Sequence, residues 1–265
     1  MKGLSTGEKR RKFIDRMYMK FWRLYLIAIL VLIIVLCLAF DKSIGEGFTS
    51  SNAQNPFDKV DIIYYINLDH RTDRNREMLG EFDRMGIPKD KIVRISAIKD
   101  TEYGDVGCSK SHVKALKQFV ESGKSNCIIF EDDFEFSQSK EIVHKSMNSL
   151  FDQKVKYDVC MLSANTIEKK DSEYPFLKKV INSQTASGYM VNRTFAEKLL
   201  QNFEEGVNIL ETKKDKSDPN RGNYCVDQYW KRLMPESKWY EFSPRLGKQR
   251  KSHSDIQGGV VEYGV

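Results

Sequence analysis

The sequence lacks the motifs of several large enzyme classes. It contains neither the GxGxxG pattern of dinucleotide-binding oxidoreductases nor the GxxxxGK[ST] pattern of P-loop enzymes. These absences argue against hydride transfer and against P-loop chemistry. There is no internal repeat, so we expect an ordinary globular domain instead of a repeat array.

Cysteine is scarce and scattered. The five cysteines never occur at CxxC or CxxH spacing, which argues against a zinc site. Cys127 and Cys160 lie in apolar, strand-like runs, where we expect buried free thiols even in a compartment that permits disulfides.

Most of the chain has no excess of basic over acidic residues. The formal net charge of +6 arises in the first 23 residues, which carry eight basic and two acidic side chains. The remaining 35 basic and 35 acidic residues balance, and no patch of interleaved basic and aromatic residues occurs among them. We therefore expect no nucleic-acid partner.

The sequence does contain one long apolar run, at 24–40, directly after these basic residues. Its length is at the lower edge of what spans a hydrocarbon core of about 30 Å. The basic flank predicts a cytoplasmic N-terminus. A cleaved signal peptide has the same order of charges and apolar residues, but Ala39, Phe40 and Asp41 form a poor cleavage site, so we favour an uncleaved single-pass anchor.

Four segments follow from this pattern. Residues 1–23 are a cytoplasmic basic tail, 24–40 a transmembrane anchor, 41–59 a flexible stem rich in Ser, Gly, Asn and Gln, and 60–265 one folded domain. The domain would face an endoplasmic reticulum or Golgi-like lumen, or project from a viral membrane.

The domain alternates apolar strands with helical patterns. We expect strands at 60–68, 92–98, 127–130, 157–163 and 185–191, with apolar stripes at helical spacing between them. The glycines at 86 and 123 follow two of these stripes and predict helix ends. This order predicts an α/β sandwich around a mainly parallel sheet, whose ligands lie at the carboxyl ends of strands.

Polar residues follow three predicted strands, at 67–74, 96–100 and 131–133. Glu131, Asp132 and Asp133 offer oxygen ligands for a hard divalent cation against a diphosphate, although acids in this position are also typical of a solvated turn. Arg71 and Arg74 could clamp a phosphate, or could pair with neighbouring acids in the first turn of a helix.

Two histidines add to these clusters. Ser111 and His112 are expected in the first turn of a helix, where free N–H groups favour an anion, although a single His is more often structural. His253 lies two residues before Asp255 and could complete a metal shell.

Together these motifs resemble glycosyltransferase family 25. The residues that carry the resemblance are Tyr65, Ile66, Asn67, Leu68, Asp69, Arg71 and Arg74, then Gly107, Cys108, Ser111 and His112, then Ile128 to Asp133. Tyr189 to Val191, Val226 to Gln228, Gln249 and Ser254 to Ile256 resemble later parts of the family pattern. The family includes bacterial lipopolysaccharide galactosyltransferases and procollagen galactosyltransferases, and related proteins occur in large DNA viruses.

The resemblance implies a GT-A type, Rossmann-like sandwich and an inverting transfer from a nucleotide-sugar to a hydroxyl. It assigns the metal to Asp133 and Glu131, with His253 as a further candidate ligand. Asp132 would contact ribose or metal. The remaining residues of the nucleotide-sugar pocket would be Asn67, Asp69, Arg71, Arg74, Ser111 and His112.

One-step inversion also requires a carboxylate that accepts the proton of the acceptor hydroxyl. Asp227 is the candidate base, with Gln228 and Trp230 available to hold a sugar. A plain helix N-cap is the other interpretation of Asp227, and Asp255 is a second candidate for the base.

We therefore expect a metal-assisted glycosyltransferase that uses Mn²⁺ and moves a hexose, most simply galactose, from a UDP-sugar to a glycan or a hydroxylated protein. The alternative is a catalytically silent relative that binds a nucleotide-sugar or glycan. The lysine-rich segment 213–221 matches no part of the family pattern, and we expect an exposed loop there.

Overall fold

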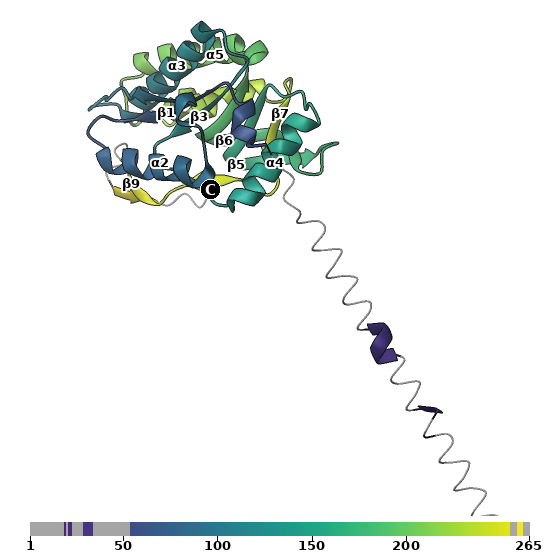
Figure 1. Ribbon diagram of the computed structural model, residues 1–265. Helices are drawn as coiled ribbons and strands as arrows, with labels where there is room; N and C mark the ends of the chain where they lie inside the picture. The colour runs from purple at the N-terminus through teal and green to yellow at the C-terminus, as the bar shows by residue number, and fades with distance from the viewer. Residues whose placement is uncertain (1–18, 20, 23–28, 34–53, 255–258, 262–265) are drawn as a thin grey trace, which may run out of the picture. The chain divides into compact units, whose positions relative to one another are not determined.

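The computed structural model describes residues 19, 21–22, 29–33, 54–254 and 259–261 (Figure 1). Two compact units can be distinguished, 1–53 and 54–265, and the fold described here is that of the second. This unit begins before the predicted boundary at 60. Phe57, which the sequence analysis placed in the stem, lies in a short 3-10 helix, η1 (Pro56–Lys59), and is fully buried in the core.

A six-stranded sheet forms the centre of the unit. Its strand order is β2 (Ile92–Ser96), β1 (Ile62–Asn67), β3 (Asn126–Glu131), β6 (Leu177–Asn192), β5 (Val159–Asp171) and β7 (Trp239–Phe242). β1 pairs in parallel with β2 and β3, and β5 pairs in parallel with β7, whereas β6 runs antiparallel to both of its neighbours. The predicted mainly parallel α/β sheet is thus confirmed.

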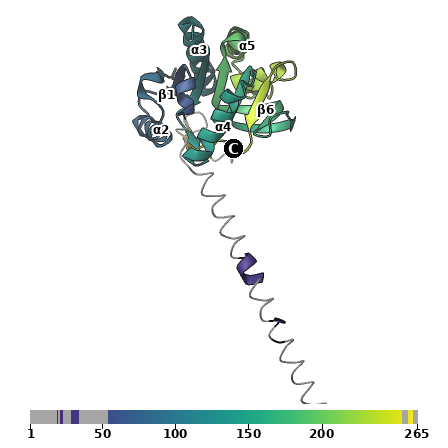
Figure 2. The same ribbon diagram turned by 45° about the vertical axis from the view of Figure 1, so that its right-hand side comes forward.

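Helices cover both faces of this sheet (Figures 1 and 2). Successive residues of β1 point to opposite faces, so Ile63 and Tyr65 join the core under α2 (Thr72–Met85) and α4 (Lys140–Asp152). Tyr64 and Ile66 join the core under α3 (Gly104–Ser122) and α5 (Arg193–Thr212). Both faces of β1 are therefore buried, which explains its continuous apolar run.

Short elements complete the unit. β4 (Phe134–Phe136) pairs with β8 (Gly247–Gln249), and β9 (Ser252–Ser254) pairs with β10 (Gly259–Val261). The other short helices are η2 (Lys89–Lys91), η3 (Arg221–Tyr224), α6 (Val226–Tyr229) and η4 (Trp230–Leu233).

The helix ends follow the predicted glycines, but one helix begins earlier than expected. Gly86 and Gly123 end α2 and α3 with left-handed φ angles of 71° and 70°. The expectation that Ser111 and His112 occupy a first helical turn is wrong, because α3 already begins at Gly104. The backbone N–H groups near His112 are thus inside the helix and cannot bind an anion.

Strands β5 and β6 extend beyond the predicted runs into a long hairpin. Its pairing continues to Asp171 opposite Lys178, and the start of β6 pairs with β7 at Leu177 opposite Phe242. β7 therefore pairs with both strands of the hairpin.

The four cysteines of this unit, Cys108, Cys127, Cys160 and Cys225, are free, and Cys127 and Cys160 are buried as expected. Of the predicted anchor at 24–40, only 29–33 are described, as helix. Across the described parts of the chain, no helix combines the length and the apolar character needed to cross a bilayer.

The backbone around Gly107 leaves no room for a side chain. A Cβ at this position would lie 2.5 Å from the carbonyl oxygen of Ile98 and 2.9 Å from the amide nitrogen of Asp100, so the backbone after β2 must shift. We expect Gly107→Ala to lower the free energy of unfolding by about 1–3 kcal/mol. Urea unfolding measures this change.

Gly80 is the matched control, because it also lies inside a helix but a Cβ there meets nothing within 4 Å. Gly80→Ala should raise stability by about 0.5–1 kcal/mol through its better helix propensity. Equal effects of the two substitutions would contradict the close approach at Gly107.

Candidate functional site

A cleft of about 560 Å³ opens at the carboxyl ends of β1, β2 and β3. The parallel pairing of these strands brings together the polar residues that follow each of them. Among the predicted site residues, the cleft is lined by Arg74, Ser111, His112, Glu131, Asp132 and Asp133. The structure thus has a cleft at the edge of the sheet where the sequence predicts the site.

Asp132 is held by a buried ion pair. Its Oδ1 lies 2.8 Å from Arg74 Nη1, and its Oδ2 accepts a hydrogen bond of 2.7 Å from Asn67 Nδ2. Burial raises the pKa of Asp132, whereas the cation and the amide oppose that rise. Both carboxylate oxygens thus have protein partners, and Asp132 connects the ends of β1 and β3 to α2.

Asp133 is buried but only partly satisfied. Its Oδ2 accepts a 3.1 Å hydrogen bond from Gln249 Nε2 and lies 3.3 Å from Arg74 Nη1, whereas its Oδ1 has no hydrogen-bond partner among the described residues. Burial, together with the negative charge of Glu131, raises the pKa of Asp133 to about 7. A buried carboxylate oxygen without a donor is costly unless a proton or a cation neutralises it.

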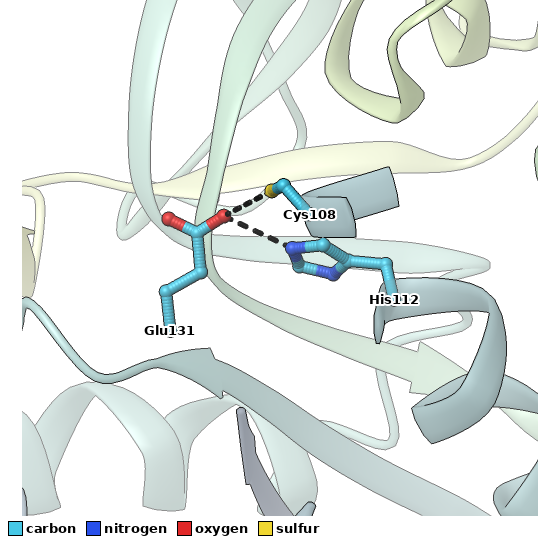
Figure 3. A group of neighbouring side chains, drawn as sticks. All are labelled: Cys108, His112 and Glu131. Atoms are coloured by element: carbon cyan, nitrogen blue, oxygen red, sulfur yellow. Dashed lines mark hydrogen bonds and ion pairs between the residues drawn. The ribbon is translucent and has the colours of Figure 1, made fainter. Parts of the chain in front are cut away.

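Glu131 is oriented by two side chains of α3 (Figure 3). Its Oε1 lies 3.0 Å from His112 Nε2 and accepts a weak hydrogen bond of 3.7 Å from the thiol of Cys108. His112 is fully buried, and its Nδ1 lies 3.0 Å from the hydroxyl of Tyr189 on β6. His112 therefore holds Glu131 through one ring nitrogen and Tyr189 through the other.

These contacts fit the divalent cation predicted from the sequence. Glu131 and Asp133 both line the cleft, and their negative charges repel each other. Asp133 Oδ1 has no hydrogen-bond partner among the described residues and is free to bind a cation. Oxygen ligands of this kind suit Mg²⁺ or Mn²⁺. The side chain of His253 lies outside the described residues, so its predicted contribution stays a prediction.

Three residues predicted for the nucleotide pocket, Asn67, Asp69 and Arg71, do not line the cleft. Asp69 is exposed and pairs with Arg94 at 2.7 Å, and Arg71 Nη2 lies 2.9 Å from Asp73. Hydrogen bonds from Arg94 and Ser96 lower the pKa of Asp69. Arg74 does reach the cleft, but its Nη1 contacts two carboxylates, and its predicted contact with a nucleotide stays a prediction.

Asp227 lies in the first turn of α6, and burial raises its pKa, with a further contribution from the charge of Glu131. Its Oδ2 accepts hydrogen bonds from the backbone N–H of Thr185 at 3.1 Å and from Gln228 Nε2 at 3.3 Å. Thr185 has a φ of 76°, an unfavourable conformation for a β-branched residue. The strained backbone of Thr185 thus donates its N–H to the half-buried Asp227.

The expectation that Trp230 could hold a sugar is wrong. Its side chain is fully buried between Tyr189, Phe203 and Trp239, and its indole N–H donates to Ser183 O. Asp255, the second candidate base, lies outside the described residues.

The structure also brings to the site three residues to which the sequence analysis gave no individual role. Lys99, Cys108 and Lys216 line the cleft. Cys108 and His112 are four residues apart on a helix, and residues at this spacing share a face. This spacing could have indicated that both contact Glu131. Nothing in the sequence around Lys216 indicates its position.

Asp133 predicts a specific pH dependence of stability. Its pKa is higher in the folded state, about 7, than the ordinary value of 3.8, so the folded state binds more protons between these values and stability falls as pH rises through this window. Asp133→Asn should remove this loss, which is on the order of 2–3 kcal/mol between pH 5 and pH 8. Urea unfolding at both pH values measures it.

Asp171→Asn is the control, because Asp171 is exposed and its ion pair with Lys178 lowers its pKa. This variant should keep the pH dependence of the unsubstituted protein. A pH profile of Asp133→Asn parallel to that of the unsubstituted protein would show that the Asp133 carboxyl titrates normally.

Comparisons with known proteins agree with the motifs. Residues 89–216 match the model of glycosyltransferase family 25 (LPS biosynthesis protein). A "Glycosyltransferase 25 family member" of Anopheles gambiae is 24% identical over 191 residues, which cover 60% of this chain and 32% of the relative. The chain thus spans about a third of the length of this curated relative.

Two solved structures show weak likeness. A glycosyltransferase involved in the glycosylation of the major capsid of PBCV-1 gives a TM-score of 0.43 at 8% identity, covering 74% of this chain and 95% of that one. A mannose-1-phosphate geranyltransferase from Thermus thermophilus gives 0.39 at 7% identity, covering 71% and 58%. At such scores neither serves as a template for the site. The match over 89–216, which includes α3 and the acidic triplet, confirms the resemblance to glycosyltransferase family 25.

Proposed function

We propose that this protein is a metal-assisted inverting glycosyltransferase that moves a hexose from a nucleotide-sugar to a hydroxyl of a glycan or protein. The observation that carries the proposal is the buried, partnerless Oδ1 of Asp133 beside Glu131, in a cleft at the carboxyl ends of parallel strands. The match to glycosyltransferase family 25 supports the reaction class.

Different residues would bind the cation and orient its ligands. Glu131 and Asp133 would hold a divalent cation, which supplies positive charge to the diphosphate as it leaves. His112 and Cys108 orient Glu131, and Arg74 stabilises the acidic triplet through Asp132. Substitution of any of these supporting groups therefore changes the geometry of the cleft without removing an oxygen ligand.

Asp227 is the proposed base. Its raised pKa makes its carboxylate a better proton acceptor than an exposed aspartate, and the N–H of Thr185 fixes its orientation. In a single displacement, the acceptor oxygen forms the new bond to the anomeric carbon while its proton passes to Asp227. The bond from that carbon to the diphosphate breaks, and the diphosphate leaves with the electron pair.

The donor and the setting are further parts of the proposal. The resemblance to a family that includes galactosyltransferases favours a UDP-hexose, most simply UDP-galactose, with Mn²⁺ as the cation. In the first 40 residues, basic side chains are followed by an apolar run. This order favours a single-pass anchor that places the GT-A domain in a lumen or on a viral membrane.

The proposal predicts metal-dependent turnover that requires Asp133. The full chain with Mn²⁺ should release UDP from UDP-galactose, and Asp133→Asn should lower kcat/KM by at least about 100-fold because it removes one charged ligand. Asp227→Asn should lower kcat by roughly 100-fold with a smaller effect on KM. Measured release of UDP from a panel of UDP-sugars tests both.

Asp171→Asn, on the exposed part of the β5–β6 hairpin, should retain full turnover. If no UDP-sugar is turned over with any divalent cation, the enzyme proposal fails. If nucleotide-sugar binding persists without turnover, the catalytically silent alternative replaces it.

A further inference from the structure

The lysine-rich segment 213–221 contributes to the cleft a residue that has no role in the reaction proposed above. It connects α5 to η3, and Lys216 in its middle lines the same cleft as Glu131 and Asp133. Lys216 is exposed and has no carboxylate partner among the described residues. Acidic residues at 100, 102 and 131–133 line the cleft, and Lys216 adds a cation to it from a separate segment.

The backbone of this segment is held in place at several points. The hydroxyl of Tyr103, the residue before α3, donates a 3.0 Å hydrogen bond to the carbonyl oxygen of Lys214. Arg221 donates from Nε to the carbonyl oxygen of Lys213 at 2.9 Å and pairs with Asp105 on α3. These contacts fix the segment against the start of α3 and keep Lys216 at the cleft.

The side chains of this segment crowd three cations around one ring. Lys214 Nζ, Lys216 Nζ and Arg221 Cζ lie 5.1, 4.8 and 4.9 Å from the ring centroid of Tyr103. Arg221 is neutralised by its acid partner, whereas the aromatic face is the one partner of Lys216 among the described residues, a contact worth about 0.5–1 kcal/mol at an exposed site. An anion that enters the cleft can therefore displace the ring as the partner of Lys216 at little cost.

We propose that Lys216 binds the diphosphate of the nucleotide-sugar in the cleft that it lines together with the acidic triplet. This inference rests on the proposed function, which supplies the diphosphate. Glu131 and Asp133 would hold a divalent cation that neutralises part of the diphosphate charge, and the Lys216 ammonium would donate hydrogen bonds to phosphate oxygens. Lys216 thereby neutralises charge that grows when the bond to the sugar breaks.

The test compares nucleotide binding in matched variants of the full chain with Mn²⁺. Lys216→Gln should weaken the binding of UDP about tenfold, because it removes one charge-assisted hydrogen bond, and should leave the binding of uridine unchanged. Lys216→Arg should restore most of the affinity. Isothermal titration calorimetry measures each of these affinities.

Lys214→Gln is the matched control, since Lys214 belongs to the same segment and contacts the same ring but does not line the cleft. Its affinity for UDP should match that of the unsubstituted protein. Equal weakening by both variants, or none by Lys216→Gln, would overturn the inference and leave the proposed function standing. If the unsubstituted protein itself fails to bind UDP, the proposed function falls, and this inference falls with it.

Discussion

The contact between Arg74 and the two aspartates after β3 is the interaction on which the site depends. Arg74 is buried on α2 and reaches Asp132 at 2.8 Å and Asp133 at 3.3 Å, so one guanidinium offsets the repulsion between adjacent carboxylates. Asn67 at the end of β1 adds a hydrogen bond to Asp132. Loss of the guanidinium would leave buried negative charge unpaired, which is more costly than loss of an exposed pair.

This arrangement assigns different tasks to three consecutive acids. Both oxygens of Asp132 have partners on β1 and α2, whereas Glu131 and Asp133 keep oxygen atoms directed to the cleft that all three acids line. The supporting contacts come from α3 for Glu131 and from Gln249 of β8 for Asp133. The acidic triplet is therefore assembled by segments that lie far apart in the sequence, and its chemistry cannot be assigned from the three residues alone.

Local patterns predicted the parts of the molecule that local forces determine, and missed those that depend on distant contacts. The helix ends at Gly86 and Gly123 require left-handed backbone, which the glycines make visible in the sequence. Lys216 reaches the cleft only because segment 213–221 docks on Tyr103, and Trp230 was misjudged because its aromatic neighbours come from β6, α5 and β7. Contacts between distant segments leave no periodic signal in the chain.

The double pairing of β7 also determines how this sheet meets other molecules. A free edge strand presents unpaired N–H and C=O groups that can recruit a strand from another chain. β7 instead has the start of β6 paired along it in addition to β5. At the opposite edge β2 is short and carries Arg94 in an ion pair with Asp69. Both ends of the sheet thus oppose edge-to-edge aggregation, one by self-pairing and the other by short length and charge.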